Sequence, residues 1–293
     1  MVVSLALISA IGFACASVGQ YRASRAQAEH LNMSIGLLTG LFRSVDFLWS
    51  IGFDVVGIAG QFVALIFGPI SVVQPVLSLG LVLAIVIERR LARRSLSVVE
   101  LLATLAVALL LTAFVVLRGT STTEAVSSSL TVLVSLIVFG GCAILYLVAK
   151  RTKERLPTLL VAGFGALSLG CASVLEREVG LQIDVGVVHA LTGYQLWILL
   201  ASAPLSLLLT QSAFQFGELK LVLPILTVGE PLVAMVLGRF MVGEPLFPSQ
   251  NLLWGLAALI GLACSLIVLA RSESIFRSAV SDSTSASSEG DGS

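Results

Sequence analysis

The stretch FGELKLVLPILTVGEPLVAMVLGRF, from Phe216 to Phe240, is apolar enough to cross a bilayer but carries Glu230 near its middle. A charge at that depth costs about 2.5–3.5 kcal/mol on insertion scales, so it normally faces a cavity or a partner. Pro231 follows the glutamate, and Pro224 lies about two turns earlier. Because proline removes a helical hydrogen bond, we expect both to break the helix.

A second stretch, FGPISVVQPVLSLGLVLAIVIE from Phe67 to Glu88, repeats this pattern at an offset of 149 residues. Both copies begin with Phe-Gly, and three further pairs match without a gap: Val73 and Val222, Pro75 and Pro224, Gly80 and Gly229. The tetrapeptide CASV also occurs twice, starting at Cys15 and Cys171, which are 156 residues apart. The two matches predict an internal duplication.

The composition indicates a membrane protein. The 293 residues are 57% hydrophobic and 12% charged, with a mean hydropathy of +1.04. A soluble domain has about a quarter charged residues, and apolar runs long enough to span a bilayer recur along this chain. The formal net charge is zero, which gives no sign of a nucleic-acid partner. The predicted fold class is therefore an all-α polytopic membrane protein whose surroundings are the lipid bilayer.

Nine membrane spans can be drawn, and the first lacks the positive start of a cleaved signal peptide. A further apolar segment, 31–41, is too short to span and is interpreted as interfacial or re-entrant. The spans cover residues 2–20, 45–67, 69–88, 97–117, 129–149, 157–176, 191–215, 219–241 and 250–270.

The distribution of Lys and Arg predicts the topology. Fourteen lie in the odd-numbered connections or after the last span, and only Arg118, Arg177 and Arg239 lie on the other side. Because cytoplasmic loops carry the excess of positive charge, we expect the N-terminus outside the cell membrane and the C-terminus in the cytoplasm.

This topology makes the duplicated units inverted. Spans one to four match spans six to nine, and the fifth span reverses the second unit. The predicted organisation is a first membrane repeat at 1–117, a linking span at 118–156, a second repeat at 157–272 and a disordered Ser-rich tail at 273–293. Inverted repeats with a midplane site between them are a recurrent plan of secondary transporters.

The layout resembles the drug/metabolite transporter superfamily in its tight hairpins at FGP and FGE, its proline-bearing third span and its duplicated four-span unit. The segment ALIFGPISVVQPVLSLGLVLAIVIERRL, Ala64 to Leu91, is similar to the NIPA-like branch, and this resemblance implies magnesium as a candidate substrate. The resemblance covers about residues 1–272. It implies a carrier fold, while the superfamily's substrates include amino acids, nucleotide sugars, drugs and other metabolites.

Two acidic residues at membrane depth are the leading candidates for a substrate or ion pathway: Asp54 in the second span and Glu230 in the eighth. In the duplicated frame Asp54 matches Ala203 and Glu230 matches Leu81, so each repeat supplies one carboxylate. We expect the pair to line one asymmetric cavity suited to a cation, an amine or a coupled proton. The alternative is that each acid is paired structurally with a hydroxyl group or an arginine.

Amide side chains in the spans are the second set of candidates, because an amide can donate and accept hydrogen bonds. They suit a varied polar ligand or serve as interhelical contacts worth about 1 kcal/mol each. Gln211 and Gln215 share one helix face. The pathway candidates are Gln61, Gln74, Gln211 and Gln215, and the predicted helix breaks are Pro75, Pro224 and Pro231.

Charges near the span ends are expected to be peripheral. Glu88 and Glu100 flank the Arg-rich third connection and are predicted to be solvated, while Glu218 and Lys220 are interpreted as a plain loop. A stripe of small residues in the ninth span predicts close helix packing within the fold or in a homodimer: Ala257, Gly261 and Ser265.

Enzymatic function is not expected. The sequence contains no nucleophile–base arrangement, P-loop or dinucleotide fingerprint, and its four cysteines lie in apolar runs without metal-ligand spacing. We expect no cofactor, and the sequence leaves open whether the chain binds a metal ion. The leading hypothesis is a secondary, ATP-independent transporter of a small metabolite, drug or cation by alternating access. The alternatives are a NIPA-like Mg²⁺ transporter and a non-transporting membrane assembly protein.

Overall fold

The computed structural model describes residues 2–67, 70–95, 97–118, 128–152, 156–242 and 251–289, and within these ranges the secondary structure is helical. The helices are α1 (Val2–Ala26), η1 (Glu29–Leu31), α2 (Ile35–Phe42), α3 (Val45–Phe67), α4 (Ile70–Leu91), α5 (Val98–Arg118), α6 (Ser128–Thr152), α7 (Thr158–Val185), α8 (Val187–Thr192), α9 (Tyr194–Phe216), α10 (Leu219–Val242) and α11 (Leu252–Glu289).

Eight helices in the described part of the chain are long and apolar enough to cross a membrane: α1, α3, α5, α6, α7, α9, α10 and α11. The predicted all-α, multi-pass membrane class is confirmed. The remaining predicted span is α4, a helix of 22 residues that is not among the eight and whose last turns carry Glu88, Arg89 and Arg90. The predicted short segment 31–41 corresponds to η1 and α2.

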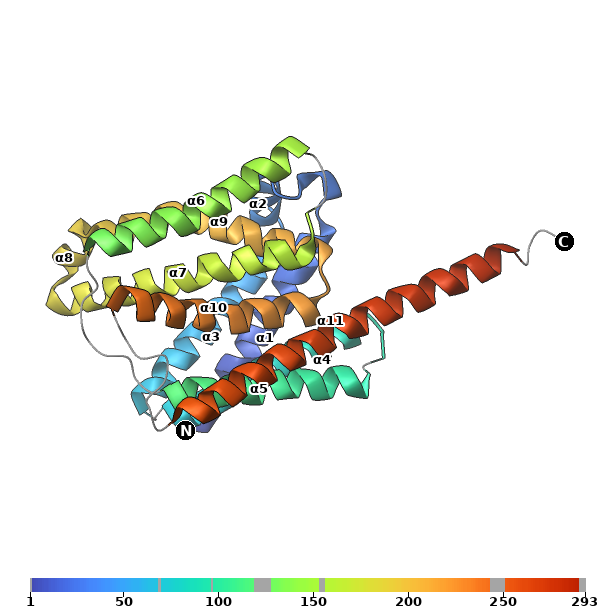
Figure 1. Ribbon diagram of the computed structural model, residues 1–293, viewed down its shortest axis with the longest axis horizontal. Helices are drawn as coiled ribbons and strands as arrows, with labels where there is room; N and C mark the ends of the chain where they lie inside the picture. The colour runs from blue at the N-terminus through green and yellow to red at the C-terminus, as the bar shows by residue number, and fades with distance from the viewer. Residues whose placement is uncertain are drawn as a thin grey trace.

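The long helices pack in two groups with the same internal order. In the first, α1 lies against α3 and α4, and α4 lies against α5. In the second, α7 lies against α9 and α10, and α10 lies against α11. The groups meet where α5 packs on α11 and where α1 packs on α9, while α6 lies at one edge beside α7 and α9 (Figure 1).

Equivalent small-residue contacts hold the central pair of each group together. A Cβ atom on Gly80 of α4 would lie 3.0 Å from the carbonyl oxygen of Ala10 in α1. A Cβ atom on Gly229 of α10 would lie 2.5 Å from the Cβ atom of Ala166 in α7. The two glycines are 149 residues apart and the two alanines 156, which are the offsets of the two sequence matches. The same contact therefore occurs twice.

The prolines do not interrupt their helices. Pro75 lies inside α4, and Pro224 and Pro231 lie inside α10, so the predicted helix breaks are wrong. Each proline still removes one backbone donor, but packing on the neighbouring helices keeps the rest of the hydrogen-bond ladder in place.

The C-terminal part of the chain differs from the expectation of a disordered tail at 273–293. The structure continues α11 as a helix to Glu289, well beyond the bundle (Figure 1). Extending an existing helix adds one bond per residue without the cost of a new nucleus, which is why a weakly helical, Ser-rich sequence can follow a packed helix. Of the small-residue stripe in α11, Gly261 lies against Leu110 of α5, so at least this member packs within the fold.

The close contact between α7 and α10 predicts the effect of adding one methyl group. Gly229→Ala should destabilise the protein by about 1–3 kcal/mol, because the new Cβ atom cannot fit beside Ala166 unless the helices separate. The measurement is the thermal unfolding midpoint of the purified protein in detergent. The matched control is Gly140→Ala in α6, where a Cβ atom meets nothing within 4 Å. That variant should be neutral or up to about 1 kcal/mol more stable. Equal midpoints for the two variants would contradict the prediction.

Candidate functional site

Two adjoining cavities lie between the two helix groups, and both are lined by Ser17 of α1 and Leu223 of α10. The first, called the Glu230 cavity, has a volume of about 390 Å³. It is also lined by Phe13, Gln61, Leu77, Ser78, Gly80, Leu81, Leu111, Val115, Thr227, Glu230 and Pro231. The second, called the Asp54 cavity, has a volume of about 420 Å³. It is also lined by Gln20, Asp54, Leu169, Ala172, Glu176, Leu199, Ser202, Ala203, Ser206, Leu207, Thr210, Gln211, Phe214 and Leu226.

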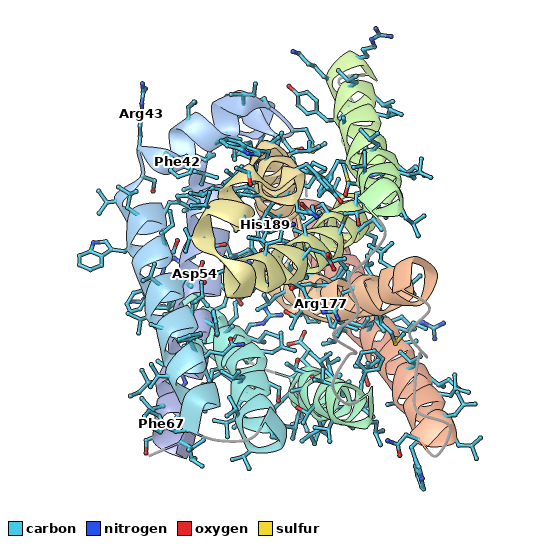
Figure 2. All side chains as sticks on the ribbon, turned by 90° about the vertical axis from the view of Figure 1, so that its left-hand side faces the viewer. Phe42, Arg43, Asp54, Phe67, Arg177 and His189 are labelled. Carbon is cyan, nitrogen blue, oxygen red and sulfur yellow. The ribbon has the colours of Figure 1, made fainter. Side chains whose placement is uncertain are left out.

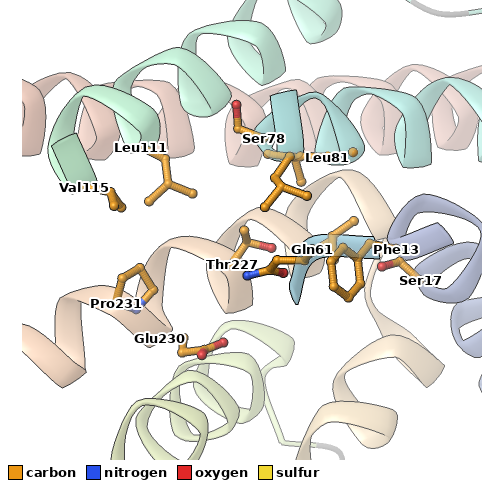
Figure 3. Close-up of a pocket in the computed structure, with 13 residues that line it drawn as sticks. Phe13, Ser17, Gln61, Ser78, Leu81, Leu111, Val115, Thr227, Glu230 and Pro231 are labelled. Carbon is orange, nitrogen blue, oxygen red and sulfur yellow. The ribbon is translucent and has the colours of Figure 1, made fainter. Parts of the chain in front are cut away.

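In the Glu230 cavity three polar side chains face part of the apolar lining, while Ser17 and Ser78 lie elsewhere in it (Figure 3). Figure 3 shows Gln61, Thr227 and Glu230 facing the apolar side chains of Leu111 and Val115 across the space. Because Pro231 has no N–H, the carbonyl group of Thr227 lacks its usual helical partner at this point. The predicted pathway residues Gln61 and Glu230 therefore line one cavity.

Glu230 is held by a residue of the repeated tetrapeptide. The Ser173 hydroxyl of α7 donates a hydrogen bond of 2.6 Å to Oε1 of Glu230. The two helices are in close contact here, since a Cβ atom on Gly170 would lie 2.7 Å from the backbone carbonyl oxygen of Glu230. Ser173, the third residue of the second CASV, is thus a hydroxyl partner of Glu230. A hydroxyl partner is what the alternative interpretation, in which each acid is paired structurally, expects.

Asp54 lies about midway along α3, between Arg43 and Phe67 in Figure 2. Gln20 of α1 donates a hydrogen bond of 2.5 Å from Nε2 to Oδ2 of Asp54. Gln211 of α9 donates from Nε2 to Oε1 of Gln20 at 3.1 Å, and the Ser24 hydroxyl donates to Oε1 of Gln211 at 2.6 Å. In this series of hydrogen bonds every donor is directed towards the carboxylate of Asp54, which suits an ionised group that only accepts hydrogen bonds.

One face of α9 lines the Asp54 cavity with hydroxyl-bearing residues at four-residue intervals: Ser202, Ser206 and Thr210. Ser202 bonds to the carbonyl oxygen of Leu199. The hydroxyl oxygens of Ser206 and Thr210 are buried and have no hydrogen-bond partner among the described residues. Such groups normally have a partner, so these two hydroxyls call for one. The four-residue spacing of hydroxyl residues was the sequence signal that could have revealed them.

The charge of both linings is negative. They contain Asp54, Glu176 and Glu230, and no Lys, Arg or His among the described lining residues. Glu176 was missed because the sixth span was predicted to end there, whereas α7 continues to Val185. No group of three or more His, Cys, Asp and Glu residues within the described ranges is arranged to hold a metal ion.

Asp54 and Glu230 line neighbouring cavities rather than the single cavity we expected. They sit on different helices, and the shared residues Ser17 and Leu223 lie on the boundary between the two spaces. The carboxylate that shares a cavity with Asp54 is instead Glu176, which was not among the predicted residues.

Gln215 does not line either cavity, although it shares a helix face with Gln211. Its Nε2 atom donates to the carbonyl oxygens of Gln27 and Ala28 at 3.2 and 3.0 Å, and its Oε1 atom accepts from Asn32 at 2.9 Å. It ties the segment after α1 to α9, which is a structural role. The side chain of Gln74, the remaining predicted amide, lies outside the described residues.

A buried cluster of ion pairs joins the two helix groups at one end of α10. Arg89 of α4 lies 3.2 Å from Glu100 of α5 and 3.5 Å from Glu218, and Lys220 of α10 pairs with Glu100 and, at 3.3 Å, with Glu218. Lys220 is 3% exposed. The prediction that Glu100 is solvated is wrong, because Arg89, 11 residues before it, and Lys220, 120 residues after it, cover it. The interpretation of Glu218 and Lys220 as a plain loop is likewise corrected.

Comparison with known proteins gives one similarity along nearly the whole chain. The chain is 28% identical over 286 residues to an uncharacterized protein of Corynebacterium glutamicum, covering 94% of this chain and 96% of that one. No family model and no solved structure matches the chain. The similarity spans both helix groups and carries no assignment of function.

The ion-pair cluster predicts a large effect for one neutralising change. Lys220→Met should destabilise the protein by about 3–5 kcal/mol, because it leaves buried Glu100 with one cation fewer. Unfolding in detergent with increasing denaturant measures the change. Lys150→Met, at an exposed lysine near the end of α6, is the control and should stay within about 0.5 kcal/mol of the parent. A Lys220→Met variant as stable as the control would contradict the structural role of the cluster.

Proposed function

We propose that this protein is a secondary, ATP-independent transporter that moves a small solute by alternating access. The observation that carries the proposal is the pair of negatively charged cavities between two similarly packed helix groups. Ionisable residues within membrane-spanning segments are costly, and those that persist commonly mark substrate or ion pathways.

The repeated packing supports an inverted duplication of four helices, with α6 as the linking span. Helices α1, α3, α4 and α5 correspond to α7, α9, α10 and α11 in this proposal. The order of packing in the two groups is the same, and the Ala10–Gly80 contact has its counterpart in Ala166–Gly229. Nine spans would place the N-terminus outside and the C-terminus in the cytoplasm, as the Lys and Arg distribution predicts. Carriers with this plan bind their substrates where the repeats meet.

Membership of the drug/metabolite transporter superfamily remains part of the proposal and is supported by the duplicated layout. The NIPA-like alternative, Mg²⁺ transport, is favoured by the oxygen donors around Asp54, since Mg²⁺ binds oxygen ligands and keeps several waters. A host deficient in magnesium uptake, rescued by the gene, would support that alternative. A non-transporting assembly role would instead require the cavities to be dispensable and residues 279–293 to be essential, which a tail deletion tests.

The proposal predicts that both membrane-depth carboxylates are needed for flux. Purified protein in proteoliposomes should transport at least one solute from a panel of amines, amino acids, nucleosides and Mg²⁺. A pH-sensitive dye inside the vesicles and direct counting of the solute inside them measure the flux. Asp54→Asn and Glu230→Gln should each lower that flux at least about ten-fold, the loss of one charge-assisted interaction. Asp46→Asn is the control, because Asp46 is an exposed carboxylate on α3 outside both cavities.

Two results would count against transport. One is a panel in which no solute and no pH gradient produces flux above empty vesicles. The other is flux that is unaffected by both cavity substitutions while the variants remain folded, as judged by size-exclusion profile and unfolding midpoint.

A further inference from the structure

We infer that the Asp54 cavity binds a small organic ammonium ion that carries N–H donors and an apolar body, with Asp54 as its charge partner and the hydroxyls of Ser206 and Thr210 as hydrogen-bond acceptors. The inference rests on the proposed function for the role of this cavity, because it names the substrate class of that site. It is carried by the charge, the unpaired polar atoms and the apolar walls of the cavity.

The charge of the lining selects a cation. Asp54 and Glu176 both line the cavity, and no described lining residue carries a positive charge. Two carboxylates in a lining that has no Lys, Arg or His among its described residues disfavour an anion and stabilise a positively charged group, most strongly where water is displaced. Glu176 is the more exposed of the two, so it can attract a cation that then reaches Asp54.

The hydrogen-bond network fixes how Asp54 meets this cation. Gln20 donates to Oδ2, and Gln211 and Ser24 hold the amide of Gln20 in that orientation. Gln211 is 0% exposed, so this support is shielded from water. With its orientation set through Oδ2, the carboxylate retains further acceptor capacity for an N–H group of the ligand.

The unpaired hydroxyls distinguish an ammonium group with N–H donors from a quaternary one. Ser206 is 6% exposed, and its Oγ atom and the Oγ1 atom of Thr210 are buried without a hydrogen-bond partner in the part of the chain that the structure describes. A buried polar atom left unpaired is costly, and an N–H donor from the ligand would satisfy it. A quaternary ammonium has no such donor and would leave both hydroxyls unpaired.

The walls and size of the cavity distinguish an organic cation from a hydrated metal ion. Leu169, Leu199, Leu207, Phe214 and Leu226 line the same space of about 420 Å³. Ligand sites of this kind are mostly apolar with a few placed polar groups. A hydrated Mg²⁺ ion would contact those leucines without benefit, whereas the hydrocarbon part of an amine is stabilised there.

Calorimetric titration of the purified protein in lipid nanodiscs tests the inference. The probes are phenethylammonium, butylammonium and cyclohexylammonium, with trimethylphenethylammonium, 2-phenylethanol and MgCl₂ for comparison. We expect at least one primary ammonium to bind. Its neutral counterpart should bind at least about ten-fold more weakly, and its trimethylated counterpart at least about five-fold more weakly. Asp54→Asn should lower the affinity for the primary ammonium about ten-fold or more. Asp46→Asn should bind as the parent does.

The hydroxyl variants give a readout that a general packing defect would not. Ser206→Ala and Thr210→Val should each lower the affinity for the primary ammonium, while the affinity for trimethylphenethylammonium changes less than about two-fold. The ratio of the two affinities should therefore fall. These variants also keep the test decisive if Asp54→Asn does not fold. The inference is overturned if no primary ammonium binds at millimolar concentration, if 2-phenylethanol or Mg²⁺ binds equally well, or if Ser206→Ala and Thr210→Val leave the preference unchanged.

Binding and flux separate this inference from the proposed function. Ammonium binding that depends on Asp54, without movement across vesicle membranes, would retain the site and reject the carrier. Flux of another solute that needs Asp54 and Glu230, with no ammonium binding, would retain the carrier and reject the substrate class.

Discussion

The close approach of α1 to α4 and of α7 to α10 is the constraint on which the site depends. Lipid provides no hydrophobic driving force between helices, so small residues that permit close packing decide which helices stay together. Ala10 meets Gly80, and Ala166 meets Gly229. Two turns after the alanine in α7, on the same helix face, Ser173 reaches the residue that follows Gly229 in α10. The contact that fixes the helices therefore also places the hydroxyl that holds Glu230.

Under the proposed duplication, the two halves share their packing and differ in their polar groups. Ser17 corresponds to Ser173, but the residue opposite is Leu81 in one half and Glu230 in the other, and Ser17 is left lining both cavities. Gln20 corresponds to Glu176 at the same offset. One is a donor to Asp54 and the other an additional carboxylate in the same cavity. The asymmetry of the site thus arises from a few substitutions on a common framework.

The sequence predicted the helices well because apolar runs of bilayer length have few other solutions, and it predicted Asp54 and Glu230 because charge is rare at that depth. It could not separate Gln211 from Gln215. They share a face, but one meets Gln20 beside a cavity and the other meets the carbonyls of Gln27 and Ala28. Glu100 was misjudged for a related reason: the arginines nearby in sequence suggested solvent, while Lys220, 120 residues away, buries it. Local pattern gives element type and depth, and long-range contacts decide what each polar group faces.

Helix α10 takes part both in the buried ion pairs and in the lining of the cavities. Lys220 begins α10 in contact with Glu100 of the first group, and Glu230 lies further along α10 beside Ser173 of the second group. A motion of one group against the other changes the contact between Lys220 and Glu100, because that ion pair crosses between the groups, whereas Ser173 and Glu230 both belong to the second group. Separating buried charges leaves each without its partner, at a cost of several kcal/mol, whereas exchanging one hydroxyl partner of a half-buried carboxylate costs less. The ion-pair end of α10 is therefore the costly place for the two groups to separate, and the Ser173–Glu230 bond can be kept when they do.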